Sequence, residues 1–460
     1  MPFSSKPQAW VYPGVPAQNA MFELQDGRKL YCVKPESHTI DSTGAIVLTG
    51  VGLANECTPA NLVIYKNNAK EVFATISGNY PNANALLSNP TKYANAITVL
   101  VNYANTNNLQ GIELDWEQYA SWTLAHTDLY KQFVNDLAIQ LHKYGRKLMI
   151  DAPAISGTLY QSFYPFFKYE DFNSSALDYV CIMAYDYQYD YGGGSPVAPL
   201  TWLSDIMTWA NNKIIDKNRI ICGLPSYGYH AAVGNYTIAI DTKTQSATVA
   251  GYNQTTNATL DAERYFDNAG QRYFYQTSTG LNTKRQTIEA GLAKSISVWH
   301  LGGNDWFNNV SQPETFETLT TLALNSTPTV SSTIGQITTF VVSYQNTGTQ
   351  SAYQLKCVVN IPTAYSTIEY SYNNLDWFAY TTQFNLPTVD QSSTKQFYIR
   401  ATATTNGTYS NSITLTGGNI NSTNLNFSSS VGTVVVIPTG ATNPVRAGKK
   451  IIRNGKIIQK

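Results

Sequence analysis

Charged side chains are scarce in this sequence. They make up 13% of its 460 residues, about half the usual share, and 30 lysines and arginines balance 30 aspartates and glutamates. A protein that binds nucleic acid needs a basic surface that neutralises phosphates. The formal net charge of zero therefore argues against nucleic acid as a partner.

Cysteine is also sparse. The five residues are widely spaced and form no CxxC pair and no Cys/His cluster, so a structural zinc site is not expected. Cys181 and Cys222 lie in apolar runs and are predicted to be buried thiols that pack as small apolar groups. Cysteine usage leaves the redox compartment open.

A long apolar segment and an export signal are missing too. No run approaches the ~20 apolar residues of a membrane span. The opening residues, MPFSSKPQAW, have neither the basic nor the apolar region of a secretory signal. Three locations stay open: the cytoplasm, the cell surface or exterior reached by another route, and a particle such as a virion.

Hydrophobic residues make up 43% of the sequence, which is enough for a folded chain. The sequence also shows a repeated strand–helix pattern. Short apolar runs rich in β-branched and aromatic residues are predicted to be strands. They are Trp10–Tyr12, Lys29–Val33, Val72–Ser77, Gly111–Glu117, Lys147–Ala152, Tyr179–Tyr185, Arg219–Pro225 and Ser297–Leu301.

Helical periodicity lies between several of these runs, at Thr91–Asn105, His126–Tyr144 and Trp202–Asn211. Repeated strand–helix units predict a parallel sheet, and eight strands predict a closed (β/α)8 TIM barrel of the α/β class over residues 1–326. An open doubly wound sheet is the alternative. The long segment His230–Lys284 is a candidate inserted subdomain that deepens a cleft.

After about residue 327, period-2 strands replace the helices. They are Ile337–Tyr344, Gln354–Ile361, Ser366–Tyr372, Lys395–Ala403, Tyr409–Thr416 and Val431–Ile437. Short strands separated by turns predict an all-β immunoglobulin-like sandwich over residues 327–437, after a linker at Ser326–Thr329. Residues 438–460 form a basic tail, either a solvated terminus or an arm that anchors the protein to a surface or particle.

One predicted strand carries acids at alternate positions: Glu113, Asp115 and Glu117. On a strand these three carboxyls share one face, and three large apolar side chains share the other. In a barrel the acids would point inward near the C-terminal rim, where the crowding of like charges and desolvation raise at least one carboxyl pKa. A general acid needs such a raised pKa. The alternative is an edge strand with its acids in water.

The stretch Gly111–Glu117 resembles the fourth-strand motif of glycoside hydrolase family 18, Asp-x-x-Asp-x-Asp-x-Glu, with Gln110 and Glu113 in place of the first two acids. Met183–Asp186 resembles the Met-x-Tyr-Asp of the sixth strand in that family. Gly223–Tyr229 and Ser297–Asp305 are similar to the seventh and eighth strands, most of all in the branch of spore-germination and peptidoglycan-acting members. The resemblance covers about residues 8–325.

The resemblance implies retaining hydrolysis of β-1,4-linked N-acetylglucosamine polymers, chitin or peptidoglycan glycan, assisted by the 2-acetamido group of the substrate. Glu117 would be the acid and base, and Asp115 would hold the acetamido N–H. Glu113 would share a proton or charge with Asp115, and Tyr185 would bind the acetamido carbonyl. Candidate substrate-binding residues are Asp186, Trp299, Tyr227, Tyr12 and Met183. No metal and no cofactor is implied.

Two further functions stay open beside the hydrolase. The barrel could be a non-catalytic sugar-binding module. It could also be part of a structural component of a surface or virion, and that role is compatible with catalysis. Glu113 adds a methylene inside a packed barrel, which is expected to affect turnover or the pH optimum.

Overall fold

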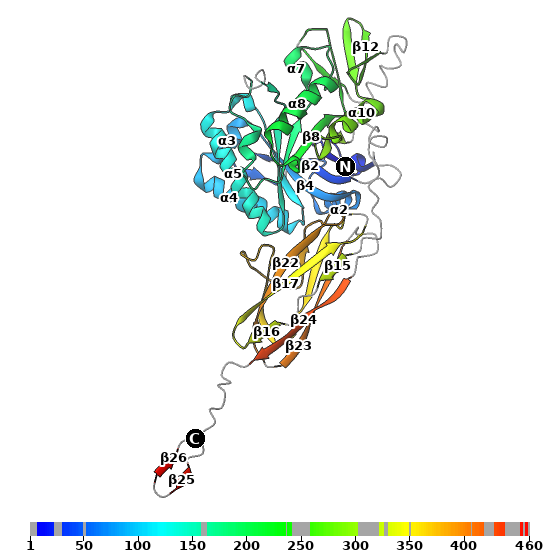
Figure 1. Cartoon of the computed structure of the whole chain (residues 1–460). Coiled ribbons are helices and arrows are strands. Elements are labelled where there is room, and N and C mark those ends of the chain that lie inside the picture. Colours follow the sequence, from blue (N-terminus) through cyan, green and yellow to red (C-terminus); the bar gives the residue numbers. More distant parts are fainter. Residues whose placement is uncertain are drawn as a thin grey trace.

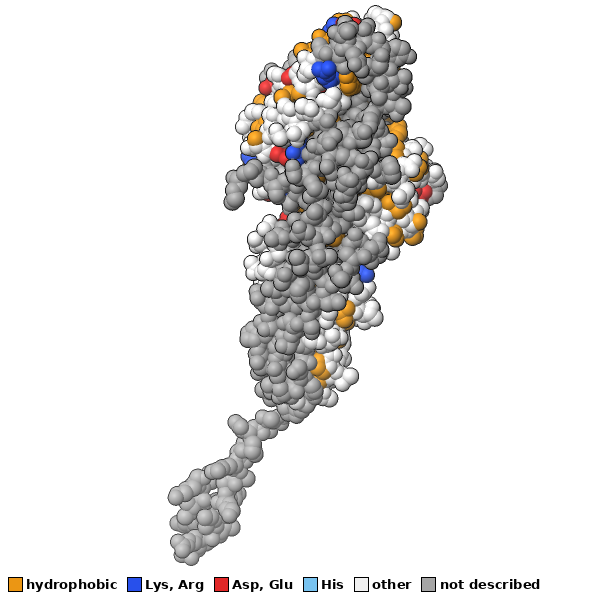
Figure 2. Space-filling view, turned by 90° about the vertical axis from the view of Figure 1, so that its right-hand side faces the viewer, with side chains coloured by type: hydrophobic (Ala, Val, Ile, Leu, Met, Phe, Trp, Pro, Cys, Tyr) orange, Lys and Arg blue, Asp and Glu red, His pale blue; other side chains and the backbone are white. Residues whose placement is uncertain are grey.

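The computed structural model describes residues 7–22, 30–48, 52–157, 163–235, 237–241, 258–301, 322–325, 330–348, 351–405, 407–417, 427–437, 451–453 and 456–458. Figure 1 shows a barrel surrounded by helices and, beyond one end of it, an all-β region. In Figure 2 the described part of one face carries only scattered charged side chains, as the composition predicts.

Residues 8–301 contain the strands of a closed parallel barrel. Its strands are β1 (Gln8–Val11), β2 (Leu30–Ile40), β4 (Ala69–Gly78), β5 (Gly111–Trp116), β6 (Lys147–Pro153), β7 (Tyr179–Met183), β8 (Ile220–Pro225) and β14 (Ser295–Leu301). Because β1 pairs with both β14 and β2, the sheet has no open edge there. The predicted eight-stranded barrel is confirmed, and the open-sheet alternative is wrong.

Helices cover the outside of the barrel. They are α1 (Ala17–Phe22), α2 (Pro59–Asn68), α3 (Tyr80–Leu87), α4 (Pro90–Thr106), α5 (Leu124–Lys143), α8 (Leu200–Lys213) and α10 (Ser278–Glu289). Side chains cap several N-termini; Thr58, Asn89 and Thr123, for example, each accept a backbone N–H of the first turn. Among the described residues, no helix combines the length and the apolar character that a bilayer crossing requires.

A second, antiparallel sheet interrupts the barrel between β8 and β14. It comprises β9 (Gly228–Ala231), β10 (Ala239–Asp241), β11 (Ala258–Leu260), β12 (Glu263–Asn268) and β13 (Gln271–Tyr275), in the order β10-β9-β13-β12-β11. This sheet confirms that the predicted segment between the seventh and eighth barrel strands is an insertion. In Figure 1, β12 lies at the end of the molecule far from the all-β region.

The described residues from Leu322 onward are all-β, as predicted. One sheet has the order β15 (Leu322–Asn325), β17 (Ile337–Asn346), β22 (Thr394–Ala403), β19 (Tyr365–Ser371) and β20 (Phe378–Ala379). The other has the order β16 (Val330–Thr333), β24 (Phe427–Ile437), β23 (Gly407–Thr416), β18 (Leu355–Asn360) and β21 (Phe384–Leu386).

Alternate residues of these strands form one apolar core. Phe340 and Val342 of β17 meet Phe397 and Ile399 of β22 and Cys357 of β18 in that core. The immunoglobulin-like topology and the predicted domain limits stay predictions. The predicted linker at Ser326–Thr329 lies outside the described residues, and the tail contains a hairpin of β25 (Ile451–Arg453) and β26 (Lys456–Ile458).

The all-β region contacts the barrel at the N-terminal end of its strands. Tyr144, just before β6, packs on Phe378 with ring centroids 4.3 Å apart. Lys143 pairs with Asp376 at 3.2 Å, and Tyr31 at the start of β2 donates to Asp390 at 3.3 Å. This docking leaves the C-terminal ends of the barrel strands, where TIM-barrel active sites lie, uncovered by the all-β region.

Candidate active site

Strand β5 divides its side chains between two faces, as the alternation predicts. Ile112, Leu114 and Trp116 are fully buried toward the helices, and Trp116 stacks on Phe133 of α5 with ring centroids 5.2 Å apart. The acids between them therefore point into the barrel. Because β5 pairs with β4 on one side and with β6 on the other, the edge-strand alternative is wrong.

Glu113 lies deepest of the acids and is fully buried. Its Oε1 accepts a hydrogen bond from Lys34 Nζ at 2.6 Å. Its Oε2 accepts from Trp10 Nε1 at 2.8 Å and from Thr75 Oγ1 at 2.5 Å. Donors from three other strands, β2, β1 and β4, thus hold this one carboxylate. Proton sharing between Glu113 and Asp115 stays a prediction.

Asp115 is the next acid along β5 toward the rim. Within the described part of the chain, its Oδ1 is buried without a hydrogen-bond partner. Burial raises the pKa of Asp115 well above its usual value, and the negative charges of Glu117, Glu36 and Glu113 raise it further, whereas Lys34 opposes them. Among the described residues, therefore, no donor occupies this oxygen of Asp115.

Glu117 follows the last residue of β5 and sits at the rim. Its backbone N–H donates to Gly78 O at 2.9 Å, which fixes the end of β5 against β4. Burial, and then the charge of Asp186, raise the pKa of Glu117 above its usual value. A carboxyl of this kind keeps its proton to higher pH than a solvated glutamate, as a general acid requires.

Glu117 opens on a cavity of about 350 Å³. The other acids of its wall are Asp186 and Asp190, and Met183 lies beside them. Aromatic side chains complete the wall: Tyr119, Tyr164, Tyr185, Tyr189 and Trp202. No lysine, arginine or histidine is among the described residues that line it. The predicted residues Glu117, Tyr185, Asp186 and Met183 thus meet at one cavity.

Asp186 is held by two tyrosines, Tyr227 just after β8 and Tyr229 on β9. Both Tyr227 and Tyr229 donate their hydroxyls to Asp186 Oδ1. Burial raises the pKa of Asp186, and these two hydrogen bonds lower it in opposition. Tyr227 therefore lies behind the cavity wall, where it orients Asp186, and it does not line the cavity itself.

Trp299 and Tyr12 lie at the ends of β14 and β1. The Trp299 ring meets Trp10 edge-on at 5.8 Å and Tyr12 at 5.9 Å, and it packs against the cluster that contains Tyr227. Tyr12 is 45% exposed and stacks on His300 at 5.0 Å. Neither Trp299 nor Tyr12 is among the described residues lining the 350 Å³ cavity, so their contact with substrate stays a prediction.

Sequence reasoning missed part of the barrel interior. Lys34 and Glu36 project from β2, and Asp151 projects from β6, at the same alternation as the interior residues Cys32 and Met149. Burial and the charges of Glu117 and Glu113 raise the pKa of Glu36 to about 8. The period-2 pattern of β2 and β6 was the signal that could have identified these residues.

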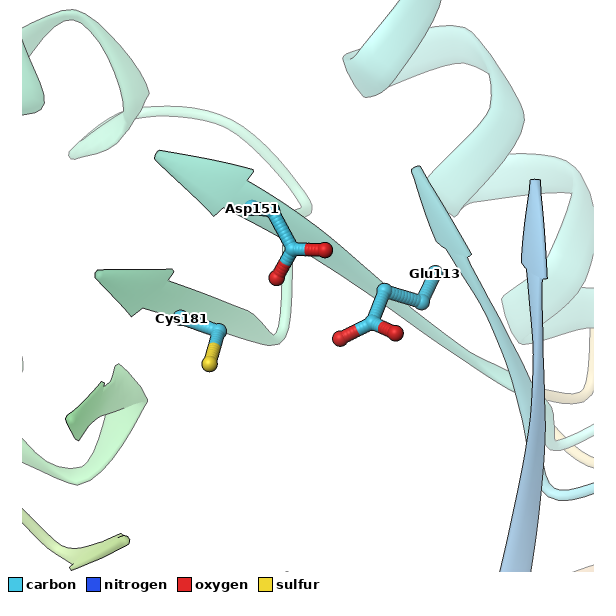
Figure 3. A group of neighbouring side chains, drawn as sticks. All are labelled: Glu113, Asp151 and Cys181. Carbon is cyan, nitrogen blue, oxygen red and sulfur yellow. The ribbon is translucent and has the colours of Figure 1, made fainter. Parts of the chain in front are cut away.

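Figure 3 shows Glu113, Asp151 and Cys181 pointing toward one another from β5, β6 and β7. Their ligand atoms all lie within 4.8 Å of one another, which is compatible with a metal ion. Lys34 Nζ, however, lies 2.6 Å from Glu113 Oε1 and 3.7 Å from Cys181 Sγ. An ammonium group thus already supplies the positive charge in this cluster, so the residues do not fit a second cation.

A family model described as glycosyl hydrolases family 18 matches residues 57–305. A putative sporulation-specific glycosylase, YdhD, of Bacillus subtilis is 25% identical over 228 residues, which is 47% of this chain and 52% of that protein. The cortical fragment-lytic enzyme of the same organism is 24% identical over 232 residues, with the same coverage. The chain spans about half the length of these curated relatives.

Solved structures show the same fold at low identity. A chitinase from Chromobacterium violaceum superposes with a TM-score of 0.57 and 18% identity, covering 67% of this chain and 98% of that one. The Bacillus cereus spore cortex-lytic enzyme SleL superposes with a TM-score of 0.55 and 17% identity, covering 67% of this chain and 75% of that one. These names confirm the predicted likeness to chitinases and to spore-cortex proteins.

The closed barrel, the inward-facing acids of β5 and the matched family model agree with one another. Because the model matches more than half of the 460 residues, the chain belongs to family 18 of the glycosyl hydrolases.

Proposed function

We propose that this protein is a retaining glycoside hydrolase that cleaves β-1,4-linked polymers of N-acetylglucosamine. The observation that carries the proposal is the position of Glu117: a carboxyl with a raised pKa that lines a cavity at the rim of the barrel beside Tyr185 and Asp186, with Asp115 two residues before it on β5. Family membership supports a glycosidase, and the names of the relatives support a polymer of amino sugars as substrate.

In the proposed first step, the acetamido oxygen of the substrate attacks its own anomeric carbon, and the glycosidic C–O bond breaks. Glu117 gives its proton to the leaving oxygen, so an oxazolinium ion forms beside a Glu117 carboxylate. In the second step, that carboxylate takes a proton from water as the water oxygen attacks the anomeric carbon, and the bond from that carbon to the acetamido oxygen breaks to restore the acetamido group. The anomeric configuration is thereby retained, and Glu117 is protonated again.

The other residues of the site bind and orient the sugar. Asp115, whose Oδ1 has no partner within the described residues, would accept the acetamido N–H. Tyr185 would donate to the acetamido carbonyl, and Asp186, oriented by Tyr227, would bind a hydroxyl near the scissile bond. Trp299 would supply an apolar surface under the ring, with Met183 and Tyr12 as flanking contacts.

Chitin and peptidoglycan glycan both fit this chemistry. The acidic wall of the cavity favours a neutral or cationic glycan over one with many carboxylates, since like charges repel in a partly desolvated site. The spore-cortex relatives point toward peptidoglycan. Both polymers are therefore needed in the test.

The decisive experiment compares the wild-type protein with Glu117→Gln on chitin oligomers and on purified peptidoglycan. Glu117→Gln should lose about 10²–10⁴-fold in turnover, because the amide can neither donate nor accept the required proton. Asp205→Asn on the exposed face of α8 is the matched control and should behave as wild type. Equal turnover by Glu117→Gln and wild type would refute the assignment. Binding of oligomers without turnover by wild type would instead favour a sugar-binding module.

We infer that the all-β region is an immunoglobulin-like sandwich that, with the basic tail, holds the barrel at a surface or particle. Docking at the N-terminal end of the barrel supports this arrangement, because it leaves the catalytic rim free. Fractionation of the producing cells with an antibody tests the location. Recovery of the protein in envelope or particle fractions would support anchoring, and recovery only as free protein would refute it.

A further inference from the structure

Lys34 is a lysine inside the barrel whose ammonium group is fully buried. Its Nζ lies 2.6 Å from Glu113 Oε1, 3.3 Å from the centre of the Trp10 ring, and 3.7 Å from both Met149 Sδ and Cys181 Sγ. Strands β1, β5, β6 and β7 thus all contribute a group to this ammonium. Neither the fourth-strand motif nor the predicted strand Lys29–Val33 includes Lys34.

The surroundings of Lys34 are otherwise acidic or neutral. Carboxyl groups come from three strands: Glu36 on β2, Glu113 and Asp115 on β5 with Glu117 at its end, and Asp151 on β6. The thiols of Cys32 and Cys181 are neutral, because burial raises their pKa values well above the usual range. Other ionisable groups that act on these side chains are Glu71 and Lys147, which form their own pair at 3.2 Å, Cys222 beside Cys181, and Asp186 beside Glu117.

Lys34 keeps its charge in this place. Burial alone would lower the pKa of Lys34, but the Glu113 carboxylate 2.6 Å from its Nζ helps to raise it above the ordinary value. Conversely, Lys34 opposes the burial and the like charges that raise the pKa of Asp115 and Asp151. One permanent positive charge therefore offsets one of several crowded carboxylates.

The geometry also fixes Glu113. With Lys34 on Oε1 and with Trp10 and Thr75 on Oε2, the carboxylate cannot turn toward Asp115 without losing a charged hydrogen bond. Both oxygens of Glu113 are thus engaged by donors from β1, β2 and β4, and Glu117, which follows β5, is the acid that lines the cavity.

We propose that Lys34 is a positioning residue of the active site, which acts through Glu113 to hold the innermost carboxylate in place and to let Asp115 ionise beside it. The inference rests on the proposed hydrolase function. Asp115 must become negative to stabilise the cationic oxazolinium intermediate, and it can do so only if Glu113 already carries its own counter-charge.

The test is the pH dependence of kcat/KM in Lys34→Met, Glu113→Gln and the double variant, on the polymer that wild type cleaves. Lys34→Met leaves an unpaired negative charge, which raises the pKa values of Asp115 and Glu117. Both limbs of the pH profile should then move to higher pH, and kcat/KM at the pH optimum of the wild type should fall about 10²-fold. Glu113→Gln leaves an unpaired positive charge, and its limbs should move to lower pH.

The double variant should bring the limbs back toward the wild-type positions, because the added charges cancel. Lys284→Met with Glu263→Gln removes an equally buried pair outside the site and should leave the limbs in place. If Lys34→Met fails to fold, the shift to lower pH in Glu113→Gln and the return of the limbs in the double variant still test the role of Lys34.

Three outcomes separate this inference from the proposed function. A wild type without turnover on either polymer overturns both. An active wild type whose profile is not shifted by Lys34→Met, or by Glu113→Gln, overturns the role of Lys34 alone. A double variant with limbs as displaced as those of a single variant also overturns that role, because charge cancellation would then be absent.

Discussion

One buried lysine–glutamate pair lies inside the barrel and another joins the inserted sheet to α10, and the two pairs make an instructive contrast. Lys34–Glu113 and Lys284–Glu263 both have an N–O distance of 2.6 Å, and all four side chains are fully buried. The two pairs therefore match in distance and in burial. They differ in the polar groups that surround them.

The pair in the insertion is saturated. Glu263 Oε2 accepts the backbone N–H of Val197, and Oε1 accepts that of Ala198, both at 2.7 Å. Lys284 also donates to Gln276 Oε1 at 3.0 Å. These bonds hold the segment after α7 (Tyr187–Tyr191) against β12 and α10, so the pair fastens one element to another.

The pair in the barrel stands beside groups that are not saturated. Within the described residues, Asp115 and Asp151 each keep one buried carboxyl oxygen without a partner. A buried polar atom without a partner costs stability, and such a cost is common where a ligand will supply the missing contact. The same ion pair is therefore part of a connection in one region and part of a reactive site in the other.

The largest expected effect comes from breaking the saturated pair. Glu263→Leu leaves the Lys284 ammonium and two backbone N–H groups buried without an acceptor, and should lower the free energy of unfolding by about 3–5 kcal/mol. Chemical denaturation measures it. Glu369→Leu is the control, because its pair with Arg400 is 23–27% exposed and should cost about 0–1 kcal/mol. Similar losses in both variants would contradict the contrast between buried and partly exposed pairs.

Replacing both members of each pair sharpens the comparison. In Lys284→Met with Glu263→Gln, the glutamine amide must face one backbone N–H, which should cost about 1–3 kcal/mol. In Lys34→Met with Glu113→Gln, the amide can occupy the Oε1 position while its oxygen keeps Trp10 and Thr75, so the change should stay within about 1 kcal/mol. Denaturation curves that show equal losses for the two double variants would refute this difference.

Glu36 should make the stability of the barrel depend on pH. Its pKa rises from the usual 4.5 to about 8 in the folded state. Between those values the folded protein binds more protons than the unfolded chain, so this contribution to stability is present at low pH and is lost as the pH rises. Glu36→Gln should therefore reduce the fall in Tm between pH 5 and pH 8. Parallel Tm curves for this variant and for wild type would contradict the raised pKa.

The smallest effect concerns the charge of the glycan. Because the described cavity wall has three acids and no cationic side chain, partly de-N-acetylated chitin oligomers should have a KM roughly two- to fivefold lower than fully acetylated ones at low ionic strength. The advantage should shrink as salt screens the charges. An advantage that does not change with salt would show that the acids of the wall are not its cause.

The strands of the barrel could be predicted because each is a short apolar run with clear ends. The prediction failed partly at β2, which was expected to end at Val33 and in fact continues to Ile40. Pro35 explains the error, since proline inside a run normally indicates a strand end or an irregular edge. The barrel accommodates it next to a shift in the register between β2 and β4, near Glu36 and His38.

The residues of the candidate site also fall into those that the sequence predicts and those that it does not. Glu113, Asp115 and Glu117 could be identified because their spacing of two places them on one face of one strand. The alternation along β2 and β6 could have placed Lys34 and Asp151 on an inward face, but not beside Glu113, because those contacts join strands that are separate in the sequence. Their importance depends on which strands face each other across the barrel.

The sequence by itself determined that eight strands alternate with helices, that one of them carries three acids on one face, and that an all-β region follows. These features are local, since side-chain periodicity of two or 3.6 residues is written along the chain. Only the tertiary structure decided that Lys34 would neutralise Glu113 and leave Asp115 with an unpartnered oxygen. Charge pairing acts through space, and closing the barrel is what brings β2 and β5 within bonding distance of each other across its interior.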